Sequence, residues 1–237
     1  MNMHENRPPT IDDVVRNKEA TMPDEAATGR VDLKELLASC KAVQRTLRRG
    51  EYLFRGGEPF DSVFLIESGC VKKCAINSAA ERVCGFRVPG ELVGLDSMGH
   101  VCQVGDAKAL CRSTVWVIPY IALLAACKRC PRLRERLTLA QAAGIRRQRC
   151  IEYIGRSYDA PQRVSLFVRD MSQRLPGRAR HFLRRNRNDV ARLLAVSGAE
   201  IARELSATVQ ARAFVSSLLQ DAVPQREKKT GARPVFS

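Results

Sequence analysis

The sequence predicts an α+β protein in which a compact β-roll is followed by a long helix and a C-terminal helical domain. Three observations lead to this prediction. Between residues 50 and 118, short apolar and polar alternations are interrupted by glycines at turn-like intervals, which is typical of strands joined by tight turns. A long amphipathic segment begins at Pro131, and an arginine-rich segment with helical periodicity follows residue 158.

Composition limits the classes of partner. The 237 residues are 45% hydrophobic, so the chain can bury a core and fits two modest domains. The 40 basic side chains exceed the 25 acidic ones and leave a formal net charge of +15, which favours an anionic partner, either nucleic acid or an anionic membrane surface. No apolar run approaches the roughly 20 residues of a membrane-spanning helix, and the N-terminus lacks a signal-peptide core. We therefore expect a cytoplasmic protein with no membrane partner.

The predicted domains follow the changes in composition along the chain. Residues 1–30 are polar and form an expected disordered arm, and 31–130 form the β-roll, preceded by a short helix within Val31 to Leu47. A helix is expected over 131–157, a second helical domain over 158–222 and a disordered basic tail over 223–237. The expected strand cores contain Leu53 and Phe54, Val63 to Ile66, Val71, Val83 to Val88, and Thr114 to Ile118.

The long helix carries a 4-3 repeat of apolar and small residues. Its members are Leu133, Leu137, Ala140, Gly144, Ile151 and Ile154, and Arg147 interrupts the repeat. Such a repeat suits pairing with a second helix. The alternative is an amphipathic helix that packs on its own roll.

Two motifs in the roll region resemble one family. Residues Gly50 to Lys72 contain G-x-x-L-F-x-x-G followed by F-x-I-x-x-G-x-V-K, and Pro89 to Asp96 read P-G-E-L-V-G-L-D. These residues resemble the double-stranded, cyclic-nucleotide-binding-domain-like β-roll of Crp/Fnr transcription regulators, Fnr-like branch. The resemblance implies a sensor roll, a dimerisation helix over 131–157, a C-terminal helix-turn-helix and a homodimer that binds double-stranded DNA. RNA polymerase is a further candidate partner.

The helix-turn-helix is expected between Asn186 and Leu205. Asp189 to Leu194 would form its first helix and Ser197 would cap the second, because a serine at this position accepts an otherwise unpaired backbone N–H. An inner face with suitable spacing consists of Val190, Leu194, Val196, Ile201 and Leu205. This segment resembles the family's helix-turn-helix, and the resemblance implies that its second helix enters the major groove of DNA.

The candidate DNA-binding residues are Arg187, Ser197, Gly198, Ala199, Glu200, Ala202 and Arg203. Only Arg203 matches the base-reading set of the Fnr-like branch, and an arginine there can donate two bonds to guanine. Ala199 stands where the family has an acidic residue, Glu200 is displaced by about 100° around the helix, and Ala195 replaces a common glycine. The β-hairpin wing that normally follows is missing or rewritten, because residues 207–223 favour a helix and contain no glycine-centred turn.

Candidate effector sites are less well defined. Gly90-Glu91-Leu92 resembles the start of the family's cyclic-nucleotide cassette, but Arg112-Ser113 lies too close to the next strand to end it. An iron–sulfur cluster requires about four thiolates, and the arm has no cysteine before Cys40. We therefore expect no cofactor. With only His4, His100 and His181 available and no nucleotide-binding loop, we expect no enzymatic activity.

The nine cysteines are an odd number in a long chain, so reduced thiols are expected. Cys127 and Cys130 form a C-x-x-C flanked by basic residues. The pair could be redox-active, could be incidental packing, or could be half of a zinc site. Other zinc ligands would come from Cys102, Cys111, Cys150 or His100.

The sequence supports two functional hypotheses. The first is a sequence-specific DNA-binding regulator of the Crp/Fnr type with an unknown effector. The second is a degenerate member that keeps the sensor and dimer helix, acts through protein contacts and binds DNA only nonspecifically.

Overall fold

The computed structural model describes residues 40–75 and 81–206. The chain divides into two compact units, Met1–Tyr153 and Ile154–Ser237. The predicted arm, the wing region and the basic tail lie outside the described residues, as does most of the predicted short helix.

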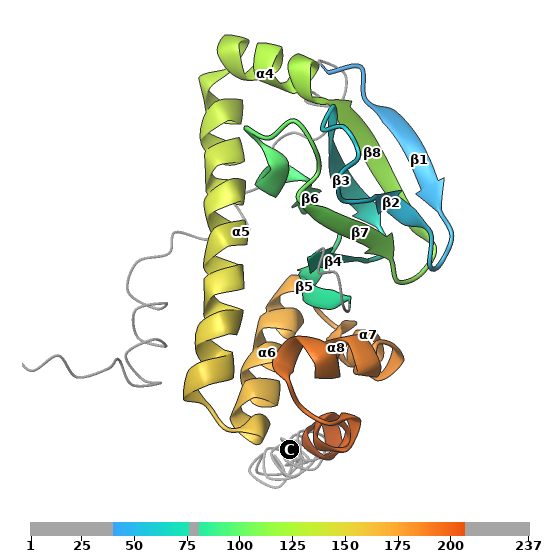
Figure 1. The fold of residues 1–237 in the computed structure, drawn as a ribbon, viewed down its shortest axis with the longest axis vertical. Helices are drawn as coiled ribbons and strands as arrows, with labels where there is room; N and C mark the ends of the chain where they lie inside the picture. The colour runs from blue at the N-terminus through green and yellow to red at the C-terminus, as the bar shows by residue number, and fades with distance from the viewer. Residues whose placement is uncertain (1–39, 76–80, 207–237) are drawn as a thin grey trace, which may run out of the picture. The chain divides into compact units, whose positions relative to one another are not determined.

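The first unit contains a roll of two four-stranded antiparallel sheets (Figure 1). One sheet has the order β1-β8-β3-β6 and the other β2-β7-β4-β5. The strands are β1 (Val43–Leu47), β2 (Tyr52–Phe54), β3 (Ser62–Ser68), β4 (Val71–Ala75), β5 (Arg82–Arg87), β6 (Leu92–Val93), β7 (Gly105–Ala109) and β8 (Ser113–Pro119). The predicted β-roll and fold class are confirmed.

The interior of the roll is an apolar cluster to which both sheets contribute. Its buried members are Leu47, Leu53, Phe54, Phe64, Ile66, Val71, Val93, Ala107, Ala109 and Val115. The rings of Phe54 and Phe64 stack with centroids 5.4 Å apart. Antiparallel pairing of β3 with β8 sets Phe64 opposite Val117 and Ile66 opposite Val115. This register buries the β-branched and aromatic residues from which the strands were predicted.

Gly69 makes the turn between β3 and β4. Its φ of 88° lies in the left-handed region, and a Cβ at this position would lie 2.6 Å from the Cα of Ser113. Glycine avoids both the conformational strain and the clash. The motif glycine is therefore required by the close approach of two strands.

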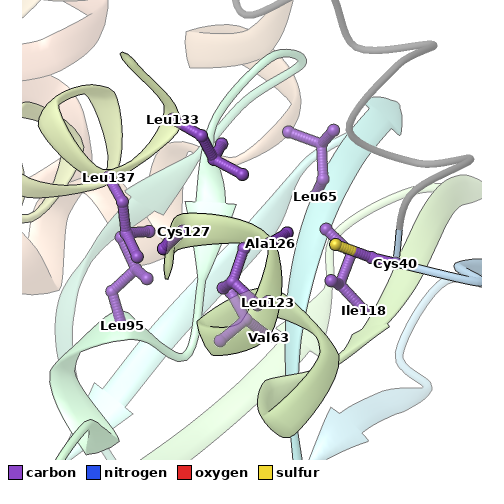
Figure 2. Close-up of a cluster of buried hydrophobic side chains, with 10 residues drawn as sticks. All are labelled: Cys40, Val63, Leu65, Leu95, Ile118, Leu123, Ala126, Cys127, Leu133 and Leu137. Carbon is purple, nitrogen blue, oxygen red and sulfur yellow. The ribbon is translucent and has the colours of Figure 1, made fainter. Parts of the chain in front are cut away.

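A second cluster lies on the outer face of the first sheet, beneath α4 (Tyr120–Arg129) and the start of α5 (Pro131–Ser157). Figure 2 shows its ten buried side chains: Cys40, Val63, Leu65, Leu95, Ile118, Leu123, Ala126, Cys127, Leu133 and Leu137. Leu95 comes from the short 3-10 helix η1 (Leu95–Ser97). The two helices are thus fixed to the roll by the burial of apolar side chains, which removes them from water.

Two sequence predictions are wrong in detail. Val43–Leu47 is strand β1, not the end of a helix, and it pairs with β8 along its whole length. Leu133 and Leu137, expected to contact a second helix, are buried in the chain's own cluster, against which Ala140 also packs. On this face, α5 therefore packs on its own roll, which was the alternative prediction. A 4-3 repeat predicts that the helix has an apolar face but does not specify which element that face contacts.

The second unit contains α6 (Ala160–Arg174), α7 (Ala179–Arg185), α8 (Arg187–Leu194) and a helical segment at 198–206. Asp159 and Gln162 form a reciprocal capping box that starts α6 after the end of α5. The buried core residues are Val164, Phe167, Met171, Ala179, Phe182, Leu183, Val190, Leu194 and Ile201. Within the described part of the chain, no helix is long and apolar enough to cross a membrane.

Candidate nucleic-acid interface

The interface is built around the turn between α8 and the helical segment 198–206. Ala195 ends α8 in the left-handed conformation, with φ 51° and ψ 51°. The N–H of Val196 then donates to the carbonyl of Ala191 at 3.0 Å, which closes the turn. Ala195 therefore adopts a conformation that favours glycine, and it costs an L-residue about 1–2 kcal/mol.

Arg163 of α6 holds this turn. Its Nη1 donates to the carbonyl oxygens of Leu194 at 2.8 Å and Ala195 at 3.2 Å. The last carbonyls of a helix lack intrahelical partners and carry partial negative charge. A guanidinium at this position donates hydrogen bonds to the carbonyls and offsets their charge. Arg163 is therefore a structural residue of the turn.

The second helix of the motif begins with a reciprocal cap. The backbone N–H of Ser197 donates to the Glu200 carboxylate at 2.6 Å, and the Glu200 N–H donates to the Ser197 hydroxyl at 3.2 Å. The predicted cap at Ser197 is confirmed. The hydrogen bond from the Ser197 backbone, followed by that from its side chain, lowers the pKa of Glu200. Glu200 thus stays ionised and is occupied at the helix start, although it was predicted as a DNA contact.

One face of segment 198–206 is open to solvent. The exposed residues are Ala199, Ala202, Arg203 and Ser206. Ile201, by contrast, is fully buried. Residues three and four apart lie on one helical face, so these four form a single surface. The hydroxyl of Ser206 donates to the carbonyl of Ala202 at 3.0 Å. Ser206 was missed at the sequence level because a serine near a helix end has no distinguishing pattern.

Gly198 and Arg187 lie together at the start of this helix. A Cβ at Gly198 would be 3.2 Å from Nε of Arg187, so the glycine leaves room for the arginine side chain. Arg187 is the first residue of α8 and is exposed. Six of the seven candidate residues therefore lie at the turn or along the helix that follows it, and the side chain of the seventh, Arg187, lies beside Gly198.

The arginines of the second unit divide into two groups. Arg180 donates to the carbonyl of Leu205 at 3.1 Å, and Arg174 pairs with Asp170 at 3.0 Å. These two, with Arg163, act inside the unit. The arginines that the structure leaves exposed are Arg156, Arg169, Arg178, Arg184, Arg185, Arg187, Arg192 and Arg203. A surface with this excess of guanidinium groups is suited to phosphates.

The two ends of the segment that resembles the cyclic-nucleotide cassette, Glu91 and Ser113, make contacts within the first unit. The Glu91 carboxylate accepts from the Val88 N–H at 3.3 Å and lies 3.8 Å from Nη1 of Arg147 on α5. Ser113 is buried, where its hydroxyl accepts from the Cys70 N–H at 3.1 Å and donates to the Cys111 carbonyl. Residues 92–107 contain no lysine or arginine.

Two buried lysines flank the roll interior. Nζ of Lys73 lies 2.7 Å from the Asp96 carboxylate and 5.0 Å from the centroid of the Phe54 ring. Lys72, its neighbour on β4, pairs with Glu81 at 2.9 Å. Buried ammonium groups need such partners to offset the loss of hydration. Lys73 and the stacked phenylalanines occupy space inside the roll.

The zinc hypothesis finds no support in the described residues. Across 40–75 and 81–206, the structure brings no three histidine, cysteine or acidic side chains into a metal-binding group. Burial, and next the hydrogen bond to Glu81, raise the pKa of Cys74 to about 12. That thiol is protonated and unsuited to metal binding.

A β-roll, a long helix and a helix-turn-helix domain, in this order, are the parts of a bacterial transcription regulator. The Cyclic nucleotide-binding domain family matches residues 44–130. The transcriptional activator protein anr of Pseudomonas aeruginosa PAO1 is 33% identical over 164 residues, which is 67% of each chain. The fumarate and nitrate reduction regulatory protein of Salmonella typhimurium is 28% identical over 167 residues, covering 68% of this chain and 67% of the relative. The chain belongs to the Crp/Fnr family of transcription regulators.

Solved structures show the same fold. FixK2 from Bradyrhizobium japonicum superimposes with a TM-score of 0.61 at 20% identity, covering 71% of this chain and 85% of FixK2. The c-di-GMP-responsive regulator CLP from Xanthomonas campestris gives a TM-score of 0.56 at 19% identity, covering 79% and 93%. At these identities the likeness concerns the fold alone.

Proposed function

We propose that this protein is a sequence-specific transcription regulator that binds duplex DNA as a homodimer through the helix at 198–206. The observation that carries the proposal is the exposed face of Ala199, Ala202 and Arg203 on a helix whose start is capped and whose preceding turn is held by Arg163. A rigidly placed helix with one polar reader suits the major groove, where base edges carry sequence information.

The readable face predicts the chemistry of the half-site. Arg203 can donate two hydrogen bonds to guanine O6 and N7, whereas the methyl groups of Ala199 and Ala202 suit the C5 methyl groups of thymine. The half-site should therefore differ from one read by an acidic residue at position 199. The exposed arginines supply phosphate contacts, which add affinity but no sequence information.

The proposed dimer uses the exposed face of α5. Leu139, Ala143, Arg146, Cys150 and Tyr153 follow a 4-3 repeat on the side opposite Leu133 and Leu137. Leu139 is 56% exposed and Tyr153 is 40% exposed. A two-fold pair would present two recognition helices to half-sites about 34 Å apart. A cytoplasmic location and contact with RNA polymerase belong to the same proposal.

Substitution at the seam tests the dimer. Leu139→Glu should give monomers in sedimentation velocity, because it buries a charge at the helix pair. Ile145→Glu is the matched control, since Ile145 is 51% exposed but lies off the repeat. Dissociation by both substitutions, or by neither, would contradict this register.

Arg203→Ala tests the reading of DNA. On a duplex selected by the protein it should cost about 1–3 kcal/mol, or roughly 5- to 150-fold in affinity, and leave binding to random duplex nearly unchanged. Arg184→Ala, exposed on α7, should weaken both duplexes equally if it contacts phosphate. Replacing thymine by deoxyuridine in the half-site should cost about 0.8 kcal/mol per lost methyl contact.

A second candidate function is supported by the small side chains at positions 199 and 202. With two alanines beside one arginine, the helix offers few polar groups to bases. A protein of this kind would bind DNA through phosphates alone and act through protein contacts. It would show equal loss of affinity for both duplexes in Arg203→Ala, and a steep salt dependence.

A further inference from the structure

The Cys127-x-x-Cys130 sequence lies at the joint between α4 and α5. Cys127 is in the last turn of α4, and Cys130 is the single residue between the two helices. Cys127 is 7% exposed and belongs to the cluster that also holds Leu133 and Leu137, as Figure 2 shows. Cys130 is exposed. One thiol of the pair is therefore accessible from solvent and the other lies in the core.

Cys130 lies at the start of α5 and is flanked by basic residues in the sequence. Its carbonyl accepts from the N–H groups of Leu133 at 3.1 Å and Arg134 at 3.3 Å, so it caps the N-terminus of the 27-residue helix α5. The first turn of α5 has no acidic residue, and Lys128, Arg129 and Arg132 flank the thiol in the sequence. An exposed thiol is accessible to oxidants in solvent, and such oxidants react with cysteine sulfur.

Cys127 has the opposite character. Burial raises the pKa of Cys127, and the neighbouring Cys130 raises it further. A protonated, covered thiol does not react with oxidants from solvent, but it can attack an oxidised sulfur one turn away. The N–H of Cys130 donates to the carbonyl of Ala126 at 2.9 Å, which closes the last turn of α4, and Cys130 itself is extended, with φ −125° and ψ 98°. Residues three apart across a helical turn are neighbours, so the two cysteines lie together at the α4–α5 joint.

We propose that Cys130 and Cys127 form a peroxide-sensitive thiol–disulfide switch at the α4–α5 joint. The Cys130 thiolate attacks one oxygen of hydrogen peroxide, the O–O bond breaks, and the departing hydroxide takes a proton to become water. Cys130 is then a sulfenic acid. The Cys127 sulfur attacks it, the S–S bond forms, the S–O bond breaks, and the thiol proton leaves with the hydroxyl as a second water. Two thiols are oxidised by two electrons and one peroxide is reduced to two waters.

Closing this disulfide would alter how α5 is anchored. A disulfide requires Cβ atoms about 3.5–4.5 Å apart. Closing it would fix the conformation of the joint and bond the Cys127 sulfur, which belongs to the cluster that buries Leu133 and Leu137, to the exposed Cys130. The cluster also contains Cys40, whose pKa is raised by burial and by its neighbour Cys127. Oxidation at the surface is thus linked to the packing of α5 on the roll.

Thiol mapping of the full-length protein tests the switch. The reduced protein is treated with hydrogen peroxide, blocked with N-ethylmaleimide and digested with trypsin, which cleaves after Lys128 and Arg129 between the two cysteines. The expected product is a pair of peptides joined through Cys127 and Cys130 and separated by dithiothreitol. Cys130→Ser should abolish it, and Cys127→Ser should leave a sulfenic acid at Cys130 that dimedone labels.

Cys102 is the matched control, because it is exposed in a loop and does not cap a helix. Cys102→Ser should leave formation of the joined peptides unchanged, and Cys102 should be oxidised several-fold more slowly than Cys130. The proposal is overturned if Cys102 reacts as fast as Cys130, if Cys127 joins Cys40 in place of Cys130, or if Cys130 is oxidised without a bond to Cys127. Because the readout is mass, the result is independent of whether the protein binds DNA.

Discussion

Replacing Ala195 by glycine should stabilise the second unit. Ala195 is exposed and has φ 51° and ψ 51°, so its methyl group is strained but contributes little burial. The left-handed conformation costs an L-residue about 1–2 kcal/mol. Glycine removes that cost but makes the unfolded chain more flexible by about 0.4–1 kcal/mol. The net stabilisation is about 0.5–1 kcal/mol.

Hydrogen exchange of peptides that span residues 187–206 measures this gain directly, since it reports the local opening of the motif. Urea denaturation followed by circular dichroism gives the free energy of unfolding, and fluorescence of Trp116 in β8 reports the other unit separately. Ala191→Gly is the matched control. It lies inside α8 and should lower stability by about 1 kcal/mol. If Ala195→Gly destabilised the unit as Ala191→Gly does, the assignment of strain to position 195 would be refuted.

Three further predictions concern the parts that hold the two units in shape. Arg163→Ala should lower the stability of the second unit by about 1–3 kcal/mol in urea, because two carbonyl oxygens lose a charged donor; an unchanged midpoint would show that water replaces the guanidinium. The pKa of Glu200 is lower in the folded protein than in the unfolded chain. The ionised carboxylate therefore stabilises the fold fully at pH values above its unfolded-state pKa, and this stabilisation is lost as the pH falls through its folded-state pKa. Glu200→Gln should therefore flatten the acid side of the stability profile, and a profile identical to wild type would contradict the capping role. Gly69→Ala should destabilise the roll by about 2 kcal/mol or more, whereas Gly99→Ala, with a similar φ of 87° and open space, should cost only about 1 kcal/mol. Equal costs would mean that Ser113 moves aside.

Elements set by local chemistry could be predicted from the sequence. The strand cores at Leu53–Phe54, Val63–Ile66, Val83–Val88 and Thr114–Ile118 and the cap at Ser197 depend on residue type and short-range spacing, and the structure confirms them. Contacts between distant residues could not be predicted. Arg163 lies 31 residues before Leu194 and Arg180 lies 25 before Leu205, and nothing in the sequence distinguishes them from arginines that face solvent.

The faces of α5 show the same limit. The buried residues that include Leu133 and the exposed residues that include Leu139 both follow a 4-3 repeat along the helix. The sequence does not show which of the two faces packs on the roll. Strand β1 was mistaken for part of a helix because its pairing with β8, about 70 residues later, outweighs local propensity. The sequence also did not show that the Glu200 carboxylate accepts a hydrogen bond from the Ser197 backbone.

The most direct test of the central claim is selection of the purified full-length protein on a randomised duplex library at about 150 mM salt, where phosphate contacts alone bind weakly. Sequencing of the bound pool should give a two-fold-symmetric motif whose half-sites are about one helical turn apart and contain guanine beside thymine. A pool without an enriched motif would contradict sequence-specific regulation through the helix that carries Arg203.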